Sequence, residues 1–275
     1  MIDETVEEIS EMQTHSSSVV AVKAAQALRD LTDREYPTVE DYLRSLDRNS
    51  SALRRANPSH ASLHTTQHRI VNTVSDAEPD DVATAKELTD EAIDDVIDSV
   101  ESSKDRAAAR AVSEIADDDV LLTHDFSSTV LAAIDDAIEA GHSFEVYVTE
   151  SRPRFLGRKM TRHLSERDEI DVTLIVDSAA GHFMSQVDRV LVGMDCIVDD
   201  TLYNRIGTYP IATAAADNDV PVTVVGAAAF ENENRSPSEV LREPAEGFQV
   251  ANPAYDATPT HLLDTVVTDD GVHEY

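Results

Sequence analysis

The sequence predicts an α/β protein in which a helical N-terminal domain precedes a domain built on a parallel sheet. Two observations predict this class. Up to residue 116 the apolar side chains recur at helical spacing, and after that point short β-branched runs alternate with helical segments. Strands that alternate with helices form parallel sheets covered on both faces. The predicted domains are therefore residues 1–116 and 117–275.

Four helices are predicted in the N-terminal domain. The first covers Val19–Leu31 and ends before Pro37, because proline interrupts a helix. The second covers Val39–Leu46 and the third Leu63–Val74. The fourth is long and runs from Leu88 to Ile115.

The second half contains short apolar runs that predict buried strands, at Val120–Leu122, Phe144–Val148, Val172–Val176, Arg189–Val192 and Val222–Val225. Helical patterns separate most of them, at 129–140, 157–167, 180–186 and 207–216. Ligands of such sheets bind at the carboxyl ends of the strands. The segments that follow predicted strands are Thr123–Ser128, Thr149–Pro153, Asp177–Ser178 and Gly193–Asp195, so we expect the functional site there.

The charge of the chain is strongly negative. Its 275 residues include 54 acidic and 22 basic side chains, which gives a formal net charge of −32. The acids are spread along the chain, unlike a disordered acidic tail, and lysine occurs only at positions 23, 86, 104 and 159. This pattern favours adaptation to high salt, where a Debye length of ~3 Å or less screens self-repulsion. The alternative is a basic partner, which would favour one acidic patch. The charge argues against direct binding to nucleic acid.

Cysteine content and hydropathy limit the class of protein further. The one cysteine, Cys196, excludes an intramolecular disulfide framework and a cysteine-rich metal site. The acidic N-terminus does not resemble a signal peptide, and no stretch approaches the ~20 apolar residues that span a bilayer. We expect a soluble, cytoplasmic protein without a membrane partner.

The turn within LLTHDFSSTVLAAI, residues 121–134, is a candidate phosphate site. Ser127 and Ser128 stand where a helix begins, and hydroxyls and free amides at a helix start can hold an anion. Helix capping alone would give the same residues. Asp125 lies beside them and could act on a ligand held there.

Other strand ends carry charged side chains. Arg152 and Arg154 could bind a phosphate through two parallel hydrogen bonds, or could be ordinary salt-bridge partners in an acidic chain. Asp195 follows an apolar run, where burial would favour proton transfer; hydrogen bonds to loop amides are the alternative. Asn204 and Arg205 precede an apparent helix start that suits an anion.

His60, His64 and His68 are spaced for one face of a helix, as paired histidines are in zinc sites. No carboxylate-rich second motif accompanies them, so we interpret them as solvated surface residues and expect no metal site. Cys196 directly follows Asp195, so its side chain points away from that residue and is expected in the core.

Seven blocks come in the order and spacing of one family: ANPSHASL (56–63), THDFSSTV (123–130), TESRPRFLGRKM (149–160), VDSAAGHFM (176–184), VLVGMDCI (190–197), NRIGTYPIA (204–212) and NPAYDATP (252–259). Over nearly its whole length the chain resembles the alpha, beta and delta regulatory subunits of translation initiation factor 2B. The resemblance implies an archaeal homologue of these subunits. Enzyme relatives in this family are methylthioribose-1-phosphate isomerase and ribose-1,5-bisphosphate isomerase. The resemblance implies a helical N-terminal domain and a Rossmann-like domain of the sugar-isomerase and CoA-transferase type, which usually dimerises.

The resemblance to the isomerases is incomplete at the catalytic positions. Their catalytic cysteine is Asp125 here, and the asparagine after it is Phe126. An arginine of the first block is Asn57, and a glutamine before the glycine of the RPxxxG block is Leu156. The second catalytic residue, an aspartate, is present as Asp195. Losing a positioned acid or base costs ~10²–10⁴ in rate, but a carboxylate can replace a thiol in proton transfer.

We therefore expect a regulatory protein that resembles the initiation factor 2B alpha-type subunits. It would bind a sugar phosphate or nucleotide and signal to a protein partner, such as a translation initiation factor. Its ligand-binding residues would be Ser127, Ser128, Arg152, Asn204 and Arg205, where Asn204-Arg205 replaces the family's Asn-Lys phosphate pair.

Two other interpretations stay open. The first is an aldose–ketose isomerase acting on a phosphorylated pentose such as ribose 1,5-bisphosphate, with Asp195 and Asp125 moving protons. The second is a metabolic binding protein without a link to translation. In each case we expect a homodimer and no cofactor.

Overall fold

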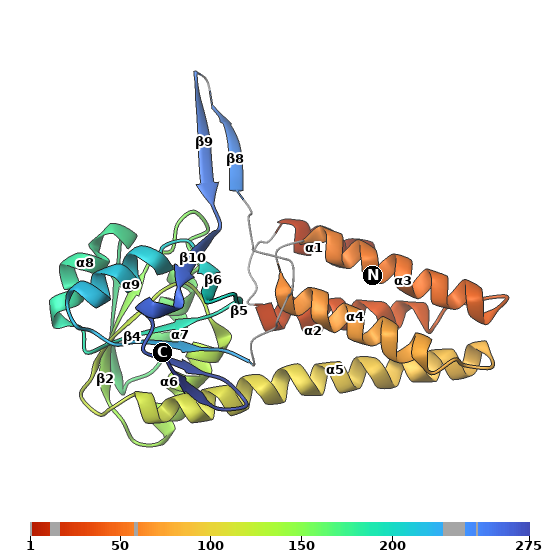
Figure 1. The fold of residues 1–275 in the computed structure, drawn as a ribbon, viewed down its shortest axis with the longest axis horizontal. Helices are drawn as coiled ribbons and strands as arrows, with labels where there is room; N and C mark the ends of the chain where they lie inside the picture. Colours follow the sequence, from red (N-terminus) through yellow and green to blue (C-terminus); the bar gives the residue numbers. More distant parts are fainter. Residues whose placement is uncertain (1, 12–16, 58–59, 228–239, 246) are drawn as a thin grey trace. The chain divides into compact units, whose positions relative to one another are not determined.

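The computed structural model describes residues 2–11, 17–57, 60–227, 240–245 and 247–275. It divides the chain into two compact units, Met1–Ser102 and Ser103–Tyr275. The division falls inside the long helix α5 (Val82–Ala111), which Figure 1 shows in yellow. The apolar spacing of the sequence changes from helical to alternating strand and helix patterns only after residue 116. The predicted boundary between residues 116 and 117 therefore stays a prediction.

The first unit is helical. Thr38 caps the second predicted helix by accepting a hydrogen bond from the Asp41 amide at 3.1 Å, and this helix extends well past Leu46. The acidic N-terminal segment, for which the sequence predicts no helix, forms a helix with Ile2 and Ile9 buried. The helices are α1 (Ile2–Glu11), α2 (Ser17–Ala27), α3 (Val39–Ala56), α4 (Ala61–Asp76) and the first part of α5.

The core of this unit is formed by leucine, isoleucine and valine side chains of all these helices. Tyr42 is fully buried among them and donates its hydroxyl hydrogen bond to Thr89 Oγ1 at 2.8 Å. Burial raises the pKa of Tyr42 to about 12, because the phenolate would lose its hydration there.

The second unit contains a seven-stranded sheet of order β12-β11-β7-β4-β1-β2-β3. All neighbouring strands are parallel except β12, which runs antiparallel to β11. The strands are β1 (Val120–Thr123), β2 (Phe144–Thr149), β3 (Ile170–Ile175), β4 (Arg189–Gly193), β7 (Val222–Val225), β11 (Thr265–Val267) and β12 (Val272–Glu274). The predicted α/β class is confirmed, and every predicted strand is present within two residues of its expected start.

Helices cover both faces of this sheet, as its apolar strands predict (Figure 1). Leu121 packs with α6 (Ser128–Glu139) and α7 (Gly157–Leu164) on one face. Its neighbour Leu122 packs with α8 (Ala180–Phe183) and α9 (Thr208–Asp217) on the other. Two adjacent residues of a strand point to opposite faces, so both must be apolar in a sheet buried on both sides.

Two smaller antiparallel sheets accompany the large one. The first joins β5 (Cys196–Val198), β6 (Thr201–Arg205) and β10 (Tyr255–Pro259), and the second joins β8 (Val240–Ala245) and β9 (Phe248–Pro253). The sequence did not predict these strands. Among the described residues, no helix is long and apolar enough to cross a membrane.

Candidate functional site

The polar residues that follow four neighbouring strands gather at one edge of the sheet. Strands β4, β1, β2 and β3 are adjacent and parallel, so their carboxyl ends point to the same side. Asp195 comes after β4, Asp125 after β1, Ser151 after β2 and Asp177 after β3. This is the edge at which ligands of parallel sheets bind.

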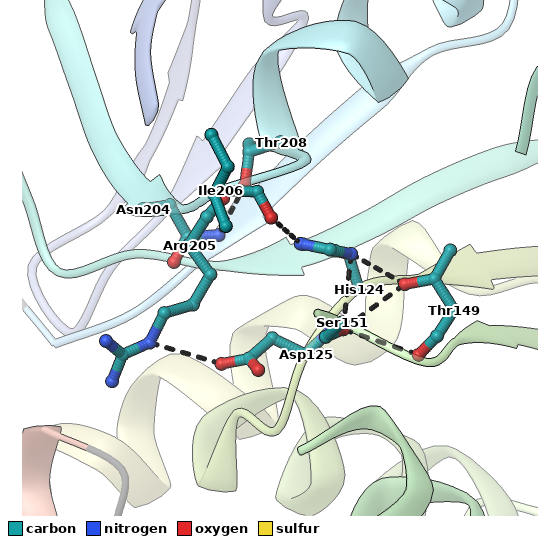
Figure 2. Close-up of polar contacts among 8 residues, drawn as sticks. All are labelled: His124, Asp125, Thr149, Ser151, Asn204, Arg205, Ile206 and Thr208. Carbon is teal, nitrogen blue, oxygen red and sulfur yellow. Dashed lines mark hydrogen bonds and ion pairs between the residues drawn. The ribbon is translucent and has the colours of Figure 1, made fainter. Parts of the chain in front are cut away.

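Asp125 forms the centre of this edge. Its Oδ2 lies 3.2 Å from Nε of Arg205, with only 9% and 12% of the Asp125 and Arg205 side chains exposed. Figure 2 shows the two side chains pointing at one another. The guanidinium carbon of Arg205 also lies 4.8 Å from the ring centroid of Tyr255. Arg205 is therefore fixed by a carboxylate and an aromatic face together.

The backbone of Asp125 has an unusual conformation. Its φ is 68°, and that of Ser151 is 63°, both in the left-handed region that residues with a side chain rarely adopt. The Asp125 amide donates a hydrogen bond of 2.7 Å to Ser151 Oγ. Such conformations concentrate at functional sites and are held by their surroundings.

His124 connects this edge to the segment before α9 (Figure 2). Its Nε2 is 2.7 Å from the Ile206 carbonyl oxygen, and its Nδ1 is 2.6 Å from Thr149 Oγ1. A carbonyl only accepts, so Nε2 carries a proton and donates to it. At Gly207, whose φ is 112°, a Cβ would lie 2.6 Å from the His124 ring. Glycine is therefore required where the two segments touch.

Asp177 binds the backbone after β2. Its Oδ1 accepts from the Ser151 amide at 2.6 Å, and its Oδ2 accepts from the Arg152 amide at 2.8 Å. The carboxylate thus ties the end of β3 to the end of β2.

The start of α6 shows the capping geometry for one of its two serines. Ser127 Oγ accepts a hydrogen bond of 3.2 Å from the Val130 amide. A Cβ at Gly193 would lie 2.6 Å from this hydroxyl, so the end of β4 can approach only as glycine. Ser128 is the first residue of α6 and is half-buried. A phosphate bound to these serines stays a prediction.

The start of α9 already holds a carboxylate of the chain. Asp256 Oδ2, from β10, accepts from the Gly207 amide at 2.7 Å and from the Tyr209 amide at 3.0 Å. Asn204 Nδ2 donates to Thr208 Oγ1 at 3.0 Å in the same turn. The sequence predicted this helix start as a seat for an external anion, but its anion is Asp256.

Arg152 is exposed, and its guanidinium carbon lies 5.1 Å from the ring centroid of Phe155. The neighbouring cation Arg158 pairs with Glu150 at 2.6 Å. Lys159 Nζ lies 4.1 Å from the ring centroid of Phe126, and burial, followed by the charge of Arg162, lowers the pKa of Lys159. Arg152 and Arg158 therefore lie over Phe155, and Lys159 lies over Phe126, the residue after Asp125.

Asp195 is buried, with 7% of the residue exposed, and its amide donates to the Tyr203 carbonyl at 3.0 Å.

Cys196 is fully buried. Burial, with a smaller effect of Asp195, raises the pKa of its thiol to about 12. A thiol of this kind is not a nucleophile at neutral pH. The prediction that Cys196 is a core residue is confirmed.

The interpretation of the three spaced histidines as surface residues is wrong for two of them. His60 and His64 are 1% and 6% exposed, and His68 is exposed. His60 directly precedes α4 and His64 lies in its first turn, where most neighbouring residues are buried as well. Within the described part of the chain, no group of histidine, cysteine and acidic side chains could hold a metal ion. Residues 58 and 59 of the first sequence block lie outside the described residues.

Sequence reasoning named Asp125 and Arg205 separately, and the structure brings them into contact. The predicted site segments Thr123–Ser128, Thr149–Pro153 and Asp177–Ser178 contain His124, Ser151 and Asp177, but these three residues were given no role. The signal for them was their place after a predicted strand. Asp256 had no comparable signal, since it belongs to a strand that the sequence did not predict.

Comparison with known proteins identifies a family for nearly the whole chain. The model of the initiation factor 2 subunit family matches residues 13–275. The chain belongs to this family. The family resemblance predicted from the seven sequence blocks is thereby confirmed.

Similar proteins of this family include enzymes and a translation factor. A ribose 1,5-bisphosphate isomerase of Methanocaldococcus jannaschii is 31% identical, over 99% of this chain and 91% of the relative. One of Haloterrigena turkmenica is 30% identical, over 97% of this chain and 88% of the relative. The solved structure of a translation initiation factor eIF-2B of Pyrococcus horikoshii has a TM-score of 0.85 and 26% identity, covering 98% of this chain and 96% of that one.

Proposed function

We propose that the chain is an aldose–ketose isomerase acting on a phosphorylated pentose such as ribose 1,5-bisphosphate. The observation that carries this proposal is the pair of buried carboxylates, Asp125 and Asp195, at the ends of the adjacent parallel strands β1 and β4. Similarity over nearly the full length to enzymes named ribose 1,5-bisphosphate isomerase supports it over the regulatory interpretation that the sequence favoured.

Two carboxylates match the proton transfers of this reaction. Conversion of a closed ribose 1-phosphate group to a ketose puts one proton on the ring oxygen and one on C1. It removes one proton from C2 and one from the hydroxyl on C2, so the protons balance. Asp125 and Asp195 would take and return these protons, which a positioned carboxylic acid and carboxylate can do.

Arg205 and the start of α6 would define where the rest of the substrate lies. The guanidinium of Arg205 would stabilise negative charge that develops on the sugar oxygens, since it is held in a buried position beside Asp125. Ser127, Ser128, Arg152 and Asn204 are the proposed phosphate ligands.

The deciding experiment is the conversion of ribose 1,5-bisphosphate and methylthioribose-1-phosphate by the purified protein in molar KCl. We expect turnover at ~1 s⁻¹ or faster, in the range of ordinary enzymes. Asp125→Asn and Asp195→Asn should each lower it by ~10²–10⁴, the cost of losing an acid or base. Asp217→Asn, at the exposed end of α9, is the matched control and should leave the rate unchanged.

A regulatory protein that senses a sugar phosphate or nucleotide is the second candidate. The observation that favours it is the ion pair of Asp125 with Arg205, at the position where the resemblance implies a catalytic cysteine in the isomerases. Binding of ribose 1,5-bisphosphate without turnover would support this candidate, and its partner would then be a translation initiation factor.

We further propose that the protein is a homodimer, as the resemblance to dimeric relatives implies. Closed two-fold pairs are the commonest oligomers. Light scattering in high salt should give about twice the 30.1 kDa mass of the chain. A monomer at micromolar concentration would contradict this proposal.

A further inference from the structure

Asp177 uses both of its carboxylate oxygens on two consecutive backbone amides. Oδ1 accepts from Ser151 at 2.6 Å and Oδ2 from Arg152 at 2.8 Å. A carboxylate can accept both bonds because each oxygen is an acceptor, whereas an asparagine side chain offers one oxygen and one N–H₂ donor. The end of β2 is therefore held by a group that asparagine cannot replace.

Ser151 passes this restraint on to Asp125. Its hydroxyl oxygen accepts the Asp125 amide hydrogen bond at 2.7 Å. Ser151 and Asp125 both have positive φ, at 63° and 68°, and this conformation is disfavoured for residues with a side chain. Each therefore needs a contact that fixes it, and the two hydrogen bonds supply one to each.

We propose that Asp177 is a positioning residue for the reaction at Asp125. It acts through Ser151, and the chain of contacts Asp177–Ser151–Asp125 sets where the Asp125 carboxylate lies relative to Arg205. The inference deepens the proposed function and rests on it where the readout is turnover. The restraint itself is a property of the fold and can be measured without a substrate.

The structure offers a matched control for Asp177. Asp188 also accepts from a strand amide, that of Val120, at 2.9 Å. This bond lies at the start of β1, whereas Asp125 follows the end of the same strand. Asp188→Asn therefore perturbs an equivalent carboxylate–amide bond on β1 without touching the candidate site.

The experiment compares Asp177→Asn, Asp177→Glu and Asp188→Asn by amide hydrogen exchange with mass spectrometry in molar KCl. We expect faster exchange in the peptide spanning residues 123–131 for Asp177→Asn, because the Asp125 amide loses its ordered acceptor. Asp188→Asn should leave that peptide as in the wild type, and Asp177→Glu should restore part of the protection. Ser151→Ala removes the hydroxyl that accepts the Asp125 amide hydrogen bond, so it should also give faster exchange at residues 123–131. It is the second variant to measure if Asp177→Asn fails to fold.

Turnover supplies the second readout. Misplacing a catalytic group by about 1 Å can cost ~10²-fold in rate, so kcat should fall by about that factor in Asp177→Asn while KM changes by less than about threefold. Unchanged exchange at residues 123–131 in a folded Asp177→Asn would overturn the positioning role of Asp177, and unchanged exchange in Ser151→Ala would overturn the step through Ser151. A wild type without turnover would instead refute the isomerase, and the exchange result would still decide the inference.

Discussion

The carboxylate of Asp125 and the guanidinium of Arg205 form a buried ion pair, with 3.2 Å between Oδ2 and Nε. Asp125 follows β1 of the large sheet, and Arg205 ends β6 of the three-stranded sheet. The pair therefore joins two sheets at the edge where a ligand is expected. It also places a fixed positive charge beside a carboxylate that the proposed reaction uses.

Removing one partner of this pair should cost more than removing both. Arg205→Ala leaves the Asp125 carboxylate buried without its guanidinium, which typically costs about 3–5 kcal/mol of the free energy of unfolding. The double variant Asp125→Asn, Arg205→Ala has no such charge and should be the more stable of the two. Urea denaturation in molar KCl measures both values. Equal stability of the single and double variants would show that water or another group stabilises the Asp125 carboxylate in place of Arg205.

The same substitution should weaken ligand binding. If Arg205 contacts a phosphorylated sugar, Arg205→Ala should reduce the affinity for ribose 1,5-bisphosphate by about 1.5–3 kcal/mol, the scale of a charged hydrogen bond. Titration calorimetry measures this loss. The control is Arg158→Ala, since Arg158 pairs with Glu150 outside the Asp125 contact. A loss as large for Arg158→Ala would mean a general effect of charge.

A methyl group at Gly207 should disrupt the contact with His124. Gly207→Ala meets both an unfavourable φ of 112° and the His124 ring at 2.6 Å. Gly141 has a φ of 94° with nothing within 4 Å of an added Cβ, so Gly141→Ala carries the backbone strain alone. We expect Gly207→Ala to be less stable than Gly141→Ala by about 1–3 kcal/mol, the range for overpacking. Equal losses in thermal denaturation would mean that the histidine ring moves aside.

Alkaline pH should destabilise the second unit through Cys196. Burial raises the pKa of this thiol from 9.0 to about 12, so the unfolded state loses its proton at lower pH than the folded state. Between these values the unfolded chain binds fewer protons, and the free energy of unfolding falls by up to about 1.4 kcal/mol per pH unit. Urea denaturation at several pH values should show this slope, and Cys196→Ala should reduce it. An unchanged slope would assign the effect to other groups.

Low salt should unfold the protein if its charge reflects adaptation to high salt. At −32 the self-repulsion is severe once the Debye length grows to ~10 Å, near 0.1 M salt. Circular dichroism at falling KCl should show loss of helix well before the salt is exhausted. Equal stability at about 50 mM and about 2 M KCl would refute the high-salt interpretation.

The sequence by itself determined the fold class, five of the seven strands of the large sheet and the edge where the polar residues gather. These features depend on local patterns, since apolar periodicity and β-branched runs are read within a few residues. These patterns alone therefore place Asp125, Ser127 and Asp195 after the ends of strands. The seven blocks determined the family in the same way, because order and spacing along the chain carry it.

The tertiary structure alone decided which of those residues meet. The contact of Asp125 with Arg205 and the filling of the α9 start by Asp256 join segments far apart in the chain. Both depend on the order and register of β6 and β10, whose short, mixed polar and apolar sequences gave no strand signal. The burial of His60 and His64 likewise follows from how helices pack. Local sequence fixes a backbone path, but pairing between distant strands and helices depends on the whole set of contacts.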